Sequence, residues 1–107
     1  MGLFESKPYK INHFSAAERA ALDVALDIGV KVAAGTPLES LLKKTKRHAS
    51  GLAFTTETLI AASACLEATI EAIVKQDPKD LRSSMLLQYM AMQAAFESAL
   101  AKLKKMV

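Results

Sequence analysis

The sequence predicts an all-α protein: a small four-helix bundle-like domain, with three long helices and one short helix, built on a C-terminal antiparallel helical hairpin and preceded by an extended N-terminal arm. Composition is the first reason. Of the 107 residues 51% are hydrophobic, mostly alanine and aliphatic residues, only 6% are aromatic, and tryptophan is absent. The second reason is that helix start and stop signals recur at helix-length spacings. A chain of this length forms one domain, which we place at residues 15–107 after an arm of residues 1–14.

In the arm, apolar and aromatic residues occur without helical spacing. We therefore expect an extended segment whose aromatic side chains, Tyr9 and Phe14, anchor it on the helices. His13 lies beside the first helix and is interpreted as a surface or capping residue.

The first helix is expected at residues 16–34. Ser15 and Glu18 have the spacing of a capping box, and Gly35 marks the end of the helix. Charged residues recur every fourth position, which predicts the ion pairs Arg19–Asp23 and Asp27–Lys31 on one narrow exposed stripe. Apolar residues occupy most of the remaining circumference, so that the helix should be largely buried. The side chains expected inside are Leu22, Val24, Leu26, Ile28 and Val32. Gly29 has small neighbours and would allow another helix to approach closely.

The second helix, residues 37–48, is short. Its predicted start has Thr36 as cap, Pro37 at the first position and Glu39 at the third. A basic cluster occupies its end: Lys43, Lys44, Lys46, Arg47 and His48. These cations can offset the negative end of the helix dipole, or they can bind phosphate, lipid headgroups or an acidic protein. A connector follows, in which Gly51 is expected to form the turn.

The hairpin is predicted from the sequence Gln76-Asp77-Pro78. Asp77 is a good N-cap, and Pro78 suits the first helical position because the missing N–H would have no partner there. The proline also disfavours the helical conformation in the preceding residue. Helices are therefore expected at residues 56–76, capped by Thr55 or Thr56, and at residues 78–105.

Each arm of the hairpin carries more contact surface than one partner needs. The first arm has a row of small residues, Ala61, Cys65, Ala68 and Ala72, and should therefore be packed on two sides. Cys65 in this row is interpreted as a small buried side chain. The second arm has a main apolar stripe and, off that stripe, Leu86, Leu87 and Met90. Either the first two helices wrap this arm, or another chain covers it.

No motif for catalysis, a cofactor or a metal ion stands out, since the four glycines are scattered and the two histidines lie far apart. We therefore expect a non-catalytic protein–protein interaction or assembly protein, adaptor-like or chaperone-like, that self-associates, as a homodimer, or binds a protein partner. The predicted interface residues are Leu86, Leu87, Met90, Ala61 and Ala68. The alternative is a nucleic-acid-binding or anionic-membrane-binding module that uses the basic cluster, although a net charge of +3 is too small to imply a nucleic-acid partner.

The sequence favours a cytoplasmic protein. Its single cysteine excludes an intrachain disulfide, and no apolar run reaches the roughly 18 residues of a spanning helix. The start of the chain, Met1 to Ser6, fits the pattern of N-myristoylated proteins. We expect an ordinary, unmodified terminus; an acyl chain on Gly2 would bind a membrane only marginally by itself, and the basic residues further on could supply the second signal.

Overall fold

The computed structural model describes residues 9–11, 13–75 and 83–106, and for residues 83–91 it describes the backbone alone. The elements, in chain order, are β1 (Tyr9–Lys10), α1 (Ala16–Val32), α2 (Glu39–Ser50), β2 (Ala53–Phe54), α3 (Thr56–Val74) and α4 (Ser83–Lys104). The predicted small all-α domain is thus confirmed, with a two-residue strand pair added to it. None of these helices, within the ranges just given, is long and apolar enough to cross a membrane.

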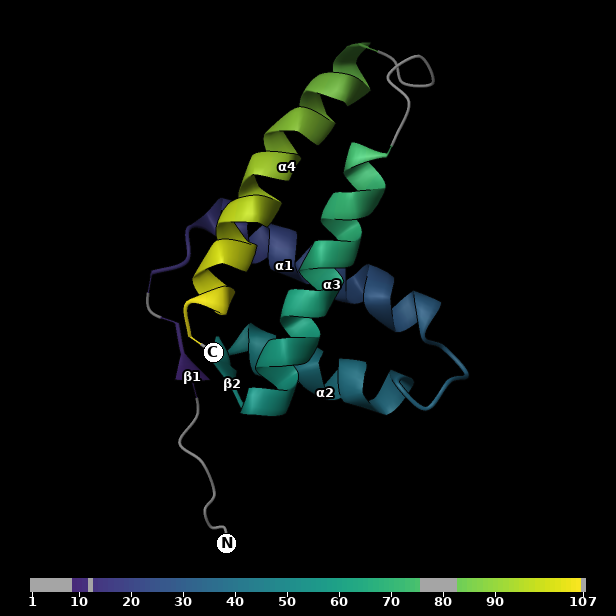
Figure 1. The fold of residues 1–107 in the computed structure, drawn as a ribbon, viewed down its shortest axis with the longest axis vertical. Coiled ribbons are helices and arrows are strands. Elements are labelled where there is room, and N and C mark those ends of the chain that lie inside the picture. Colours follow the sequence, from purple (N-terminus) through teal and green to yellow (C-terminus); the bar gives the residue numbers. More distant parts are fainter. Residues whose placement is uncertain (1–8, 12, 76–82, 107) are drawn as a thin grey trace, which may run out of the picture.

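The four helices form two crossed layers. Figure 1 shows α3 and α4 as an antiparallel pair that passes in front of α1 and α2, which run across the view. Both α3 and α4 contact α1, and α3 also contacts α2. The predicted pairing of the two C-terminal helices is confirmed, while the turn predicted at Gln76–Pro78 lies outside the described residues.

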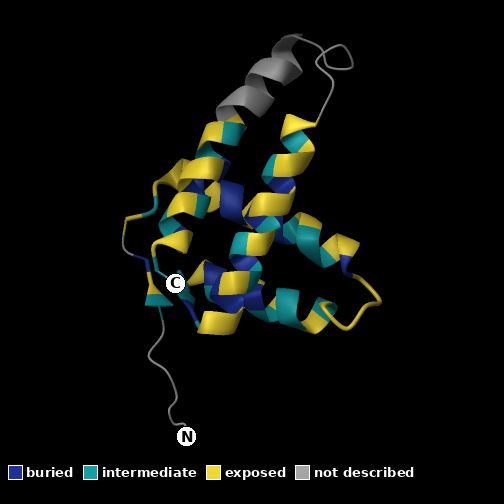
Figure 2. Ribbon diagram, in the orientation of Figure 1, coloured by how far each residue is buried: buried dark blue, intermediate teal, exposed yellow. Residues whose placement is uncertain are grey.

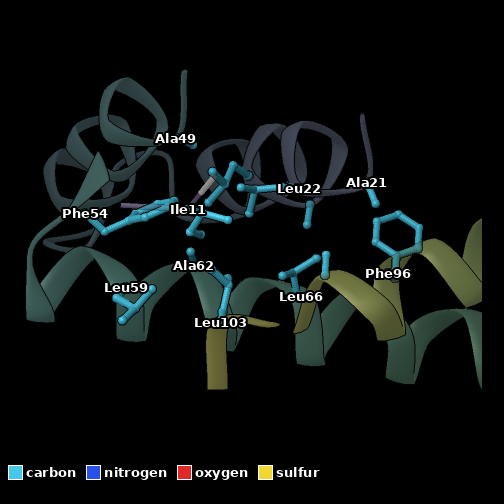
Figure 3. Close-up of a cluster of buried hydrophobic side chains, with 13 residues drawn as sticks. Ile11, Ala21, Leu22, Ala49, Phe54, Leu59, Ala62, Leu66, Phe96 and Leu103 are labelled. Atoms are coloured by element: carbon cyan, nitrogen blue, oxygen red, sulfur yellow. The ribbon is translucent and has the colours of Figure 1, made fainter. Parts of the chain in front are cut away.

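The hydrophobic core lies between the two layers (Figure 3). Its largest members are almost completely inaccessible to solvent, and each such side chain contributes roughly 1.5–3 kcal/mol by its burial. They come from α1, β2, α3 and α4: Leu22, Leu26, Phe54, Leu59, Leu66, Phe96 and Leu103.

The capping box that begins α1 is confirmed. Ser15 Oγ accepts a hydrogen bond from the backbone N–H of Glu18 at 3.1 Å, and the backbone N–H of Ser15 donates to Glu18 Oε1 at 2.7 Å. The helix ends at Val32, two residues before the predicted end, and Gly35 follows with φ of +82°. This is a conformation that glycine adopts without strain.

The predicted start of α2 was wrong. The helix begins at Glu39, and its N-cap residue, Leu38, makes no side-chain cap. The hydroxyl of Thr36 accepts a hydrogen bond from the backbone N–H of Leu38 at 3.2 Å, as predicted for a cap, and also donates to the carbonyl of Ala33 at 2.6 Å. Glu39 accepts a hydrogen bond from Gly35 N at 3.1 Å. The side chains expected to cap α2 therefore also bind the end of α1 and the loop after it.

The end of α2 and the following turn also differ from the prediction. The helix continues to Ser50, and Gly51 has φ of −99°, whereas Leu52 has φ of +52°. The left-handed residue of this turn is thus Leu52. The backbone there lies beside the N-terminal arm, because Ile11 N donates to Leu52 O at 3.0 Å.

The N-terminal arm is extended, as predicted, and pairs with β2 in antiparallel register, Tyr9 opposite Phe54 and Lys10 opposite Ala53. Tyr9 and Phe14 are half-buried, so that both aromatic residues pack on the domain. The deepest anchor is Ile11, which the sequence analysis did not single out.

The start of α3 matches the prediction. Thr55 is the N-cap, and its hydroxyl accepts a hydrogen bond from Thr58 N at 3.2 Å. Thr58 completes the box by accepting from Thr55 N at 2.9 Å.

Candidate functional site

A row of aliphatic side chains is exposed along α1. Val24, Ile28 and Val32, spaced four residues apart, are 37%, 46% and 78% accessible. The prediction that this helix is largely buried was therefore wrong on one side. The physical reason is that α2, α3 and α4 all contact α1 elsewhere on its circumference.

The helix α2 packs on the side of α1 that faces away from the exposed row. Leu42 contacts α1 at Gly29, Lys46 forms an ion pair with Asp27, and Arg19 donates to the carbonyl of Ser50 at 3.1 Å. These contacts replace the pairs predicted within α1, Arg19–Asp23 and Asp27–Lys31. Charges that were expected to form an isolated solvated stripe thus hold α2 in place.

The core face of α4 continues past the region that α1 covers. Met92 has the helical spacing of the buried residues Phe96, Ala99 and Leu103, yet it is 36% accessible. Figure 1 shows that α4 runs from a point beyond α1 towards the level of α2.

The small-residue row of α3 meets α1 at one point. A Cβ placed on Gly29 would lie 2.8 Å from Cys65 Sγ, so the two helices approach closely there, as predicted for Gly29. Cys65 is half-buried, and burial raises the pKa of its thiol. One turn later, beyond the crossing, Ala68 is exposed, whereas Ala61, one turn earlier, is half-buried.

These features define a surface that we call the apolar corner: Val24, Ile28, Val32, Ala68 and Met92. Its residues come from α1, α3 and α4, and all of them are exposed; Figure 2 shows the ribbon coloured by burial. Of the predicted interface residues, Ala68 lies in the corner and Ala61 lies on the other side of the crossing. The side chains of Leu86, Leu87 and Met90 lie outside the described residues.

The basic cluster of α2 lies among carboxylates. Lys43 pairs with Glu39 at 3.2 Å, Lys44 lies 4.0 Å from Glu57 of α3, and Lys46 pairs with Asp27 of α1. The backbone N–H of Gly35 and then Lys43 lower the pKa of Glu39, and Asp27 raises the pKa of Lys46. Much of the local positive charge is thus offset by acidic side chains of the same domain.

The remaining two members of the cluster differ from each other. Arg47 is exposed, while His48 is half-buried and its Nδ1 lies 2.9 Å from the hydroxyl of Thr58. Thr58 is fully buried and also belongs to the box that begins α3. His48 therefore joins the end of α2 to the start of α3.

A buried carboxylate near the start of α1 was missed as a tertiary contact. Glu18 pairs with Lys102 of α4 at 2.7 Å and accepts a hydrogen bond from the hydroxyl of Ser98. Burial raises the pKa of Glu18, but hydrogen bonds from Lys102, Ser15 and Ser98 outweigh this effect and lower it to about 2. The capping box revealed the local role of Glu18, but no sequence signal linked it to residues 80 and 84 positions later.

Comparison with known proteins adds no relative: no protein-family model, no curated protein and no solved structure matches this chain. The fold and its surfaces are therefore the basis for the functional proposal.

Proposed function

We propose that this protein is a non-catalytic interaction or assembly protein that self-associates, or holds a partner chain, through the apolar corner. The observation that carries the proposal is the exposed row Val24, Ile28 and Val32, which lies on the side of α1 away from its contacts with α2. Contiguous apolar surface of this kind is typical of interaction sites. The same faces support the adaptor-like or chaperone-like role expected from the sequence.

The row alone is too small to sustain a stable complex. Covering its exposed fraction would contribute on the order of 3 kcal/mol, which is less than the usual cost of association. The interface must therefore extend onto neighbouring apolar residues. Met92 is one such residue, and Leu86, Leu87 and Met90 of the same helix remain the predicted extension.

Sedimentation equilibrium of the purified chain tests this proposal. We expect the wild type to form dimers and Ile28→Glu to shift the equilibrium at least tenfold towards monomer, with circular dichroism unchanged. Ser40→Glu introduces the same charge at an exposed position of α2 and should leave the equilibrium unchanged. The pair Leu86→Glu and Met90→Glu tests the extension along α4.

A wild type that is monomeric at all concentrations would exclude self-association. The proposal as a whole would fail if, in addition, no protein that co-purifies with the wild type were lost from Ile28→Glu. We place this activity in the cytoplasm, a proposal supported by the single cysteine, which cannot form an intrachain disulfide.

A further inference from the structure

Polar side chains join the start of α1 to the last turns of α4, far apart in the sequence. Glu18 accepts hydrogen bonds from Lys102 and Ser98, and Lys102 also donates to the carbonyl of His13 at 2.7 Å. The ammonium group lies 5.7 Å from the centre of the Phe14 ring. We call Glu18, Ser98 and Lys102 the polar clasp.

Apolar burial by itself specifies the position of α4 only weakly. The buried residues of its described part are Phe96, Ala99 and Leu103. If α4 slid by one turn, these places would be taken either by Met92, Ala95 and Ala99 or by Leu100, Leu103 and Val107. Both sets are wholly apolar and differ from the native set in volume. Solvent exclusion alone therefore does not single out one of the three positions of α4.

The polar contacts of the clasp distinguish the native position of α4 from the two positions reached by a slide of one turn. A slide in the first direction would put Ala94 and Ser98 where Ser98 and Lys102 lie, so that the buried carboxylate of Glu18 would lose its cation. A slide in the other direction would put Met106 in the place of Lys102. Lys102 would then take the place of Ser98, beside Glu18, and would leave the carbonyl of His13. An unpaired buried charge is strongly unfavourable, so charge penalises the first slide, whereas the second slide costs the hydrogen bonds of Lys102 to His13 and of Ser98 to Glu18.

We propose that the polar clasp is a register lock: it fixes which turn of α4 packs on α1. In this role the ion pair contributes conformational specificity more than net stability, because the cost of removing two charges from water offsets much of their attraction. A single buried polar residue fixes register in coiled coils by the same physics.

The test replaces the clasp by uncharged groups of similar size, in the double variant Glu18→Gln/Lys102→Met. Glutamine can keep the capping box of α1. A nitroxide is attached at Ala20→Cys on the exposed side of α1, in a Cys65→Ala background, and the broadening of α4 amide signals is mapped by NMR. With the clasp intact we expect one set of α4 signals and one broadening profile. In the double variant we expect additional α4 signals whose profile is displaced by three or four residues.

The matched control removes an exposed pair that joins α3 to α4, in Glu67→Gln/Lys104→Met. This variant should keep one set of signals. A double variant of the clasp that gives one set of signals with the original profile would overturn the register lock. An unfolded double variant would overturn it as well, because the pair would then be required for stability rather than for specificity.

Discussion

The two ends of α1 are used in opposite ways. At its start, the charged residue Glu18 is only 4% accessible, while at its end the aliphatic residue Val32 is 78% accessible. Hydrophobicity would assign them the other way round. The difference is that Glu18 has charged and polar partners on α4, whereas Val32 lies on nearly the same face of α1 but at its other end, where it stays exposed. Whether a residue is buried in this domain follows from where the neighbouring elements lie, and not from the hydrophobicity of the residue alone.

Removing the cation that pairs with the buried carboxylate of Glu18 should have the largest effect on stability. Lys102→Ala leaves the carboxylate of Glu18 buried without its cation, which should lower the free energy of unfolding by about 3 kcal/mol. Lys104 lies on the same helix as Lys102, but its ion pair with Glu67 of α3 is exposed. Lys104→Ala should therefore change the free energy of unfolding by less than about 1 kcal/mol. Urea unfolding followed by circular dichroism measures both. Equal effects of the two variants would show that burial of Glu18 carries no special cost.

The same carboxylate should produce a distinct acid dependence. The folded-state pKa of Glu18 is about 2, below its ordinary value of 4.5. Because the folded pKa is depressed, the stabilisation is present above about pH 4.5 and is lost as the pH falls towards 2.

Unfolding free energies of the wild type and of Glu18→Gln, measured between pH 7 and pH 2, should therefore converge as the pH falls through this window. Ser40→Ala, which changes an exposed side chain that does not titrate, serves as the control and should give a constant difference. A gap between wild type and Glu18→Gln that stayed constant down to pH 2 would contradict the assigned ion pair.

The close contact between α1 and α3, at Gly29 and Cys65, can be tested in the same way. Gly29→Ala would place a Cβ 2.8 Å from Cys65 Sγ, so the helices must separate or the thiol must move. We expect thermal denaturation to show a loss of about 1–2 kcal/mol. In Cys65→Ala the sulfur is gone, and Gly29→Ala in that background should be neutral or stabilising by up to about 1 kcal/mol, because alanine favours the helix. An identical loss in both backgrounds would place the strain elsewhere.

Local signals in the sequence predicted the helices well, and long-range contacts were largely beyond its reach. Ser15 and Thr55 begin their helices as predicted, since capping needs only residues three positions away. Thr36 accepts a hydrogen bond from Leu38 N as predicted, but α2 begins only at Glu39, and the same hydroxyl also donates to the end of the preceding helix. The pairing of Lys46 with Asp27 and of Lys102 with Glu18 depends on how the layers cross, which no spacing within one helix encodes.

The candidate surface was predicted only in part, for the same reason. Periodicity showed that α1 is apolar around most of its circumference, but the position of α2 decides which part stays exposed. The interface residues predicted on α4 and α3, including Ala68, came from an excess of apolar or small residues. The row Val24, Ile28 and Val32 was missed because each of its members fits a core position equally well.

Substitutions on the exposed side of α1 should have the smallest effect on stability, and they test the proposed interface most directly. Val32→Ser removes an aliphatic side chain that already meets water, and it should change the free energy of unfolding of the monomer by less than about 0.5 kcal/mol. Leu26→Ala on the buried side of the same helix should cost about 2–5 kcal/mol. If the apolar corner is an interface, Val32→Ser should nonetheless weaken association in the sedimentation assay. A substitution that leaves the monomer intact and loosens the complex would separate the two roles of α1, whereas a loss of monomer stability comparable to Leu26→Ala would show that Val32 belongs to the core.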